Sequence, residues 1–195
     1  MLSASRCHLL VIDLQERLLP VIHEGDAVCS SSRFLMDAMQ LLDVPTILSE
    51  QYPRGLGMTV ELIREHPAIS GQFEKLRFSA AEGFCENTGT SGAGLEDGSW
   101  TGTERDQVLI CGIETHVCVL QTALELAGRG FEIFLAADAV GSRHPRDHDV
   151  ALQRMRDSGI TLTTAESAVF EMCGAAGTDT FRQLSQLVKS RAAQR

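Results

Sequence analysis

The stretch QVLICGIETHVCVLQTALELA, residues 107–127, decides the fold of this chain. It begins with the apolar run 107–113, which is typical of a strand that is buried on both faces of a sheet. It continues with 117–127, where apolar residues recur at helical spacing and so predict an amphipathic helix. A strand that leads directly into a helix is the repeating unit of a parallel sheet covered by helices.

The same alternation of strand and helix runs along the rest of the chain. The expected strands are 8–14, 45–48, 72–78, 131–136 and 160–163, and the expected helices are 26–42, 59–66, 146–157 and 178–191. Thr59 is expected to cap the helix 59–66. The segment 52–57, which holds a proline and two glycines, is expected to form a surface loop. We therefore predict an α/β fold of three layers, α/β/α, with a central and mostly parallel sheet.

The length of 195 residues corresponds to about one domain. With 44% hydrophobic and 22% charged residues, the composition is that of an ordinary globular protein. We expect a single domain over 1–195, because strands and helices resume after the Gly/Ser/Thr-rich stretch 87–103, which we interpret as a loop. Trp100, the one tryptophan, is expected either to anchor this loop or to cover a pocket.

The chain carries 17 basic and 26 acidic residues, a net charge of −9. Without a basic face there is no counterion release to favour nucleic acids or anionic membranes, so we expect neither as a partner. No apolar run approaches the ~20 residues that span a bilayer, and the first residues lack a signal-peptide profile. These patterns predict a soluble, cytoplasmic protein.

The six cysteines are spaced too widely for a CxxC redox pair or a zinc knuckle. They are Cys7, Cys29, Cys85, Cys111, Cys118 and Cys173. We expect reduced thiols, because disulfide scaffolds are usually short and secreted. Cys118 differs by its position, five residues beyond the strand end at Ile113. If Thr115 caps the following helix, the thiol lies in the first turn, where a helix N-terminus lowers a thiol's pKa. Cys118 is then either a nucleophile or a small core residue.

Two further polar residues lie at or near the ends of predicted strands. Asp13 ends the apolar run 9–12 and should emerge at the carboxyl edge of the sheet, where parallel sheets bind ligands; capping of a turn is the alternative. Lys75 interrupts the half-buried strand 72–78 and either reaches such a site or snorkels from an edge strand. An ammonium close to a thiol and a carboxylate would hold a thiolate and stabilise negative charge on a substrate.

The chain contains LVIDLQ at 10–15, FEK at 73–75 and CGIETHVCV at 111–119. In order and spacing these motifs resemble those of the isochorismatase-like cysteine hydrolases, a superfamily that includes nicotinamidases and N-carbamoyl amidohydrolases and uses an Asp-Lys-Cys triad. The resemblance runs from about residue 7 to residue 173. SEQYPRGLG at 49–57 is further similar to the isochorismatase-domain-containing subgroup, whose substrates are mostly unassigned.

The resemblance implies hydrolysis of a C–N bond in a small amide or carbamoyl compound. Asp13 would take the Cys118 proton as general base, the thiolate would attack the carbonyl carbon, and water would then hydrolyse the thioester. Lys75 would orient both groups electrostatically. The resemblance also implies a cis peptide bond between Ile113 and Glu114, with the backbone N–H groups of Glu114 and Cys118 as oxyanion donors.

The resemblance also bears on cofactors and substrate contacts. Nicotinamidases carry a metal-binding Asp-x-His after the second strand, where this chain has Ser49-Glu50-Gln51. We therefore predict no catalytic metal and no other cofactor. The residues expected to contact the substrate are Gln15, Gln51, Tyr52 and Ile113. A homo-oligomer is implied as well.

Two functions from other classes stay open. A catalytically silent scaffold on the same fold is one, although the chain retains all three residues of the triad. A thiol redox sensor is the other, although the neighbouring Cys111 is expected to be buried in its strand. His144 and His148 are four residues apart like zinc ligands, but Pro145 between them favours a solvated helix start. Asp138 is expected to cap a turn.

Overall fold

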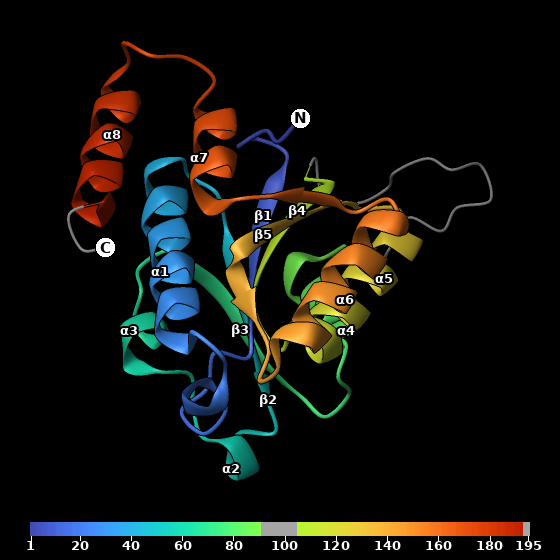
Figure 1. Ribbon diagram of the computed structural model, residues 1–195. Coiled ribbons are helices and arrows are strands. Elements are labelled where there is room, and N and C mark those ends of the chain that lie inside the picture. Colours follow the sequence, from blue (N-terminus) through green and yellow to red (C-terminus); the bar gives the residue numbers. More distant parts are fainter. Residues whose placement is uncertain (91–104, 193–195) are drawn as a thin grey trace.

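The computed structural model describes residues 1–90 and 105–192 (Figure 1). The described residues form a sheet of six parallel strands in the order β3-β2-β1-β4-β5-β6. The strands are β1 (Cys7–Ile12), β2 (Thr46–Gln51), β3 (Ile69–Lys75), β4 (Gln107–Ile113), β5 (Glu132–Gly141) and β6 (Thr161–Thr163). The predicted parallel α/β sheet is confirmed.

Helices cover both faces of the sheet and complete three layers (Figure 1). One face carries α1 (Gly25–Leu41), α7 (Ala165–Cys173) and α8 (Asp179–Ala192). The other carries α4 (Ala81–Thr88), α5 (Leu120–Gly128) and α6 (Pro145–Asp157). Short helical turns are Leu19–Val21, α2 (Pro53–Leu56) and α3 (Glu61–Arg64). None of the helices in the described part of the chain is long and apolar enough to cross a membrane.

The central strand β1 shows why the run 9–12 is apolar at every position. Leu9 and Val11 pack in the core beneath α1, whereas Leu10 and Ile12 pack in the core beneath α5. All four are fully buried. Since successive side chains of a strand point to opposite faces, a strand covered on both sides has no solvent-facing position.

Three expected elements differ from the structure around the second and third strands. The helix expected at 59–66 is only α3, and Thr59 does not cap it. The Thr59 backbone N–H and hydroxyl instead donate to the buried Glu50 carboxylate at 2.6 and 2.7 Å, because a buried carboxylate requires donors. The strand expected at 72–78 begins earlier and ends at Lys75, and the loop expected at 52–57 contains α2.

Sequence patterns also missed two helices. Residues 87 and 88, expected in a loop, belong to α4. The remainder of that expected loop from residue 91, with Trp100, lies outside the described residues. The helix α7 could have been found from Thr164, whose side chain accepts a hydrogen bond from the Ser167 backbone N–H as an N-cap. The strand β5, expected at 131–136, extends to Gly141.

Strand order reverses between β1 and β4, and such a switch point opens a crevice at the carboxyl edge of the sheet. Gly112 allows the two strands to meet there, directly opposite Ile12. Its φ is +117°, and a Cβ at this position would lie 2.1 Å from the Ile12 carbonyl oxygen. Glycine is therefore required by both conformation and space.

We expect Gly112→Ala to lower the free energy of unfolding by at least about 3 kcal/mol, because it adds both backbone strain and overlap with β1. Urea unfolding of the purified variants measures this. Gly128→Ala is the matched control, since a Cβ on Gly128 meets nothing within 4 Å. Equal unfolding midpoints for the two variants would show that the close approach of β1 and β4 does not constrain residue 112.

Candidate active site

Polar side chains gather where four neighbouring strands end. Asp13 directly follows β1, and Lys75 is the last residue of β3. Ser49 and Gln51 lie in the second half of β2, and Gln51 is its last residue. Cys118 lies in the turn that follows β4. Because the strands are parallel, these ends lie at one edge of the sheet.

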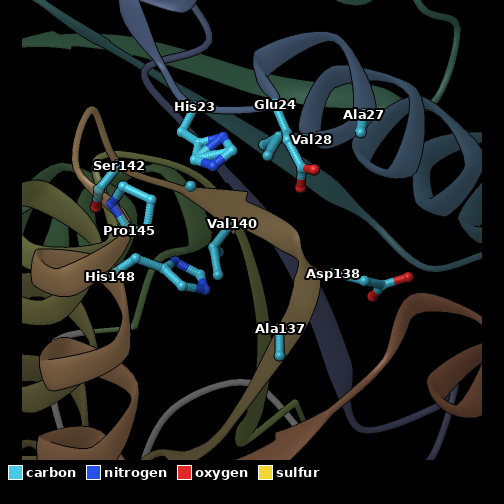
Figure 2. Close-up of a pocket in the computed structure, with 11 residues that line it drawn as sticks. His23, Glu24, Ala27, Val28, Ala137, Asp138, Val140, Ser142, Pro145 and His148 are labelled. Atoms are coloured by element: carbon cyan, nitrogen blue, oxygen red, sulfur yellow. The ribbon is translucent and has the colours of Figure 1, made fainter.

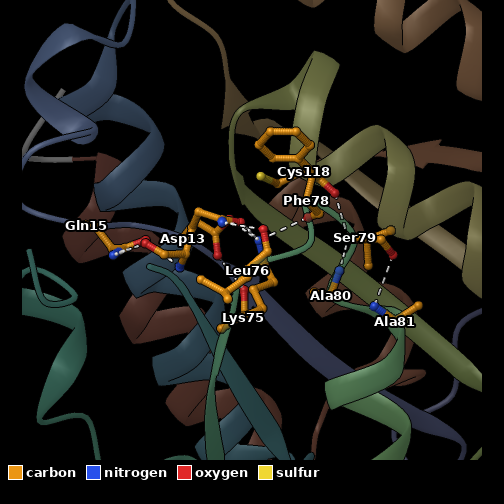
Figure 3. Close-up of polar contacts among 12 residues, drawn as sticks. Asp13, Gln15, Lys75, Leu76, Phe78, Ser79, Ala80, Ala81 and Cys118 are labelled. Atoms are coloured by element: carbon orange, nitrogen blue, oxygen red, sulfur yellow. Dashed lines mark hydrogen bonds and ion pairs between the residues drawn. The ribbon is translucent and has the colours of Figure 1, made fainter. Parts of the chain in front are cut away.

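Asp13 and Lys75 form a buried ion pair (Figure 3). Lys75 Nζ donates to Asp13 Oδ2 at 2.7 Å, and the two side chains are 6% and 0% exposed. Asp13 has a φ of +52°, so the chain turns sharply as it leaves β1. The ammonium thus meets the carboxylate out of contact with bulk water, where their attraction is strongest.

The Lys75 ammonium has two further acceptors, the Gln51 side-chain oxygen at 2.8 Å and the Phe78 carbonyl at 3.0 Å. Gln51 Nε2 donates to the Leu76 carbonyl at 2.9 Å, which directs Oε1 toward Lys75. All three donors of the ammonium are therefore used. This arrangement fixes the position of the charge beside Asp13.

Ser49 holds the other oxygen of the Asp13 carboxylate, and sequence reasoning missed it. Its hydroxyl donates to Oδ1 at 2.7 Å, and its carbonyl accepts from the Asp13 backbone N–H at 3.1 Å. Ser49 is directly opposite Ile12 in the pairing of β1 with β2. A hydroxyl directly after the buried apolar pair Ile47 and Leu48, in the strand next to the one that Asp13 follows, is the signal that could have found it.

Cys118 lies in a π-helical turn, Thr115–Val119, that leads into α5. The backbone N–H groups of Val117 and Val119 both donate to the Glu114 carbonyl, at 3.1 and 3.2 Å. The preceding peptide bond, between Ile113 and Glu114, is cis. The sequence led us to expect Thr115 as the N-cap, and this expectation is wrong, because Glu114 takes that position. The Thr115 hydroxyl instead contacts His148 Nδ1 at 3.0 Å.

The expectation that a helix N-terminus lowers the pKa of Cys118 is wrong. Burial, and after it the nearby Asp13 charge, raise the pKa of the thiol to about 12, while Lys75 acts in the opposite sense. The side chain is only 6% exposed. Desolvation of the charged form outweighs the dipole of the helix, so the resting side chain is a protonated thiol.

Burial also raises the pKa of Asp13 above its ordinary value. The Lys75 charge and hydrogen bonds from Lys75, Ser49 and Cys118 oppose this rise. The thiol and the carboxylate therefore lie close enough to shift each other's pKa, and both are buried. A carboxylate with increased proton affinity next to a protonated thiol can accept its proton.

The expected substrate contacts lie in different surroundings. Gln15 is fully buried, its amide donates to the carbonyls of Gln51 and Gly57 at 3.0 and 2.7 Å, and its oxygen accepts from the Gln51 N–H at 2.8 Å. Ile113 is buried in the core on the α1 side. Tyr52 is half exposed, and its backbone N–H donates to the Lys75 carbonyl.

The carboxylates near the site have protein partners. Glu114 Oε2 accepts from the Arg143 backbone N–H and Nε, both at 3.1 Å, and Glu50 accepts from Thr59. Within 1–90 and 105–192, no group of three or more His, Cys, Asp or Glu residues is arranged to hold a metal ion. The absence of a catalytic metal stays a prediction from the sequence.

A cavity of about 190 Å³ lies beside this region, between the start of α1, the end of β5 and the start of α6 (Figure 2). His23, Glu24 and His148 line it, whereas Asp13, Lys75 and Cys118 do not.

Pro145 starts α6 and His144 precedes it as the N-cap, as the sequence indicates. Asp138, also at this cavity, accepts from the first backbone N–H of α7 and binds Arg191. The cavity is thus separate from the Asp13, Lys75 and Cys118 cluster.

The model of the isochorismatase domain family matches residues 7–167. This chain belongs to the isochorismatase family. Its fold is therefore that of the isochorismatase-family hydrolases, as the motifs around Asp13, Lys75 and Cys118 predict.

Several relatives of this isochorismatase-family chain are similar over most of their length. The secreted isochorismatase effector Isc1 of Phytophthora sojae is 35% identical over 185 residues, which cover 93% of this chain and 83% of Isc1. Isochorismatase domain-containing protein 2 of Bos taurus is 36% identical over 185 residues, covering 93% and 82%. The structure of MAR1 ribonuclease from Caenorhabditis elegans superposes with a TM-score of 0.85 at 34% identity, covering 96% and 91%.

We expect Asp13→Asn to speed alkylation of Cys118 by iodoacetamide about tenfold at pH 8, because loss of the negative charge lowers the pKa of the thiol. Lys75→Met should slow the same reaction, since it removes the opposing positive charge. Peptide mapping by mass spectrometry gives both rates.

Cys173, which is half buried and far along the chain in α7, is the internal control and should react equally in all variants. Slower alkylation of Cys118 in Asp13→Asn than in the wild type would contradict the direct interaction of the carboxylate with the thiol.

Proposed function

We propose that this protein is a cysteine-dependent hydrolase that cleaves a C–N bond of a small amide or carbamoyl compound through a thioester. The observation that carries the proposal is the buried ion pair of Asp13 with Lys75 at the edge of the sheet where the Cys118 thiol also lies, with the thiol and the carboxylate each shifting the pKa of the other. A base, a nucleophile and a fixed positive charge are the parts that acyl transfer requires.

In the first half of the reaction, the Cys118 proton passes to Asp13 as the sulfur attacks the carbonyl carbon. The tetrahedral intermediate collapses when its C–N bond breaks, and Asp13 returns the proton to the leaving nitrogen. The amine or ammonia departs and leaves a thioester on Cys118. Because the resting thiol is protonated, transfer to Asp13 is an obligatory part of this attack.

In the second half, Asp13 takes a proton from a water molecule that attacks the thioester carbon. The C–S bond breaks, the sulfur recovers the proton from Asp13, and the acid is released. The site returns to its starting state, with atoms and charges balanced.

Lys75 stabilises negative charge during both halves without itself losing a proton. Its ammonium is held by Asp13, Gln51 and the Phe78 carbonyl, so its charge is fixed beside the reacting atoms before substrate arrives. We assign the backbone N–H groups of Glu114 and Cys118 as donors to the oxyanion of the tetrahedral intermediate.

The surroundings of the expected substrate contacts divide them into two groups. The amides of Gln15 and Gln51 are engaged within the protein, so we assign them to positioning of β2 and of Lys75. Tyr52, half exposed next to Lys75, is the side chain left to contact substrate, and Ile113 shapes the backbone at the end of β4. The small exposed area of the thiol favours small substrates.

The redox-sensor alternative is weaker than hydrolysis. Oxidation follows thiolate character and exposure, and burial raises the pKa of Cys118 to about 12. Cys111, the nearest cysteine in the sequence, is buried in the core on the α1 side of the sheet, whereas Cys118 packs in the core on the α5 side. A disulfide between them would have to pass through β4.

The remaining proposals rest on the sequence. We propose a single domain over 1–195, a homo-oligomer and a cytoplasmic location. One relative is described as a secreted effector, so relatives differ in where they act. A solved structure similar to this chain is named as a ribonuclease, so RNA belongs among the substrates to be assayed. The net charge of −9 on this chain disfavours binding of RNA.

We expect Cys118→Ala to lower kcat/KM by about 10³-fold or more on any amide that the wild type hydrolyses, because the nucleophile is lost. The assay is release of amine or ammonia from a panel of small primary amides and N-carbamoyl amino acids, with fragment analysis of a short RNA beside it. Cys85→Ala, another buried cysteine, is the matched control and should retain activity. Full hydrolysis by Cys118→Ala would rule out the proposal.

We expect activity on that substrate to survive exhaustive treatment with EDTA, because every proposed step uses Asp13, Lys75 or Cys118. Rates before and after treatment, with metal analysis of the purified protein, give the answer. A parallel loss of bound metal and activity, restored by adding the metal back, would overturn the metal-free mechanism.

A further inference from the structure

Besides the Cys118 thiol, Ser49 is the one neutral side chain in the described residues that donates a hydrogen bond to the Asp13 carboxylate. It binds Oδ1, whereas Lys75 binds Oδ2. Both Ser49 and Asp13 are fully buried, so water does not take the place of this hydroxyl. The backbones are joined as well, since the Asp13 N–H donates to the Ser49 carbonyl.

We propose that Ser49 is a positioning residue of the reaction, whose hydroxyl keeps Asp13 ionised and oriented toward Cys118 until the thiol gives up its proton. This inference rests on the proposed function, because it assigns Ser49 a part in the same proton transfer. Ser49 touches the base rather than the reacting atoms of the substrate.

The argument begins with the cost of burying a carboxylate. Burial favours the protonated form, which could not accept the proton of Cys118. The Ser49 hydroxyl offers its proton to an ionised oxygen, and this hydrogen bond weakens once Asp13 is protonated, so it favours the ionised form. The direction of the Asp13 pKa agrees with this, because the hydrogen bond from Ser49 opposes the rise caused by burial.

Ser49 can be substituted without removing any of the charged groups around Asp13. The titratable groups that face Asp13 are Lys75 from β3 and Cys118 from the turn after β4. Ser49, from β2, carries no charge. Replacing its hydroxyl therefore alters one hydrogen bond and leaves both charged neighbours in place.

The test compares Ser49→Ala with Ser49→Thr, which keeps a hydroxyl, and with Thr46→Val as the matched control. Thr46 is a fully buried residue of the same strand, and its hydroxyl has no hydrogen-bond partner among the residues that the structure describes. The first readout is the NMR titration of the Asp13 side-chain carbon, assigned with Asp13→Asn. The second is the dependence of kcat/KM on pH with an amide substrate. Ser49→Cys, whose thiol is a weak donor, replaces Ser49→Ala if the alanine variant does not fold.

We expect the titration midpoint of Asp13 to rise by about one pH unit in Ser49→Ala, to stay unchanged in Thr46→Val, and to return toward the wild-type value in Ser49→Thr. The acid limb of kcat/KM should move to higher pH by the same amount, so that activity below the midpoint falls about tenfold while activity at high pH changes little.

An unchanged Asp13 midpoint in Ser49→Ala would overturn the inference, as would an equal shift in Thr46→Val. A uniform loss of activity at every pH, with no movement of the acid limb, would also overturn it by giving Ser49 a structural part only. Failure of the proposed function is seen separately, as the absence of Cys118-dependent hydrolysis in the wild type, and the NMR midpoint is measured without any substrate.

Discussion

The candidate site depends on the ion pair between Asp13 and Lys75, which is 2.7 Å long and almost fully buried. Two charges removed from water are stable together only when further hydrogen bonds complete their surroundings, and removing one partner alone costs about 3–5 kcal/mol. Ser49, Gln51 and the Phe78 carbonyl complete them here. Because these groups come from the ends of β2 and β3, the pair forms only where neighbouring parallel strands end at one edge. The geometry of the site therefore depends directly on the arrangement of the strands in the sheet.

Burial controls the chemistry of the pair as well as its stability. It raises the pKa of the Cys118 thiol and of the Asp13 carboxyl together, and Lys75 lowers both. An exposed carboxylate would be a weak base toward a buried thiol, whereas one of increased proton affinity is a closer match. The fixed positive charge of Lys75 then limits the cost of each negative charge that forms on sulfur or on substrate oxygen.

Sequence patterns predict the parts of this arrangement that are local. The apolar runs of β1 and β4 are sufficient to predict the sheet, and Asp13 and Cys118 are conspicuous because they follow those runs. The Ser49 hydrogen bond is different, since it depends on the register between β1 and β2. Thr115 looks like a helix cap from its neighbours, but in the structure it contacts a histidine 33 residues further along the chain. The pKa of Cys118 was mispredicted for the same reason: a helix N-terminus is visible in the sequence, and burial is a property of the whole fold.

The most direct test of the account is the mass of the Cys118 peptide during turnover. Wild-type protein is quenched with acid while it hydrolyses an amide and is digested, and the peptide is analysed with and without hydroxylamine. The account predicts an adduct of the mass of the acyl group on Cys118, removed by hydroxylamine as the hydroxamate, in step with a burst of released amine. Turnover at the full rate with an unmodified Cys118, or with the acyl group on another residue, would contradict it.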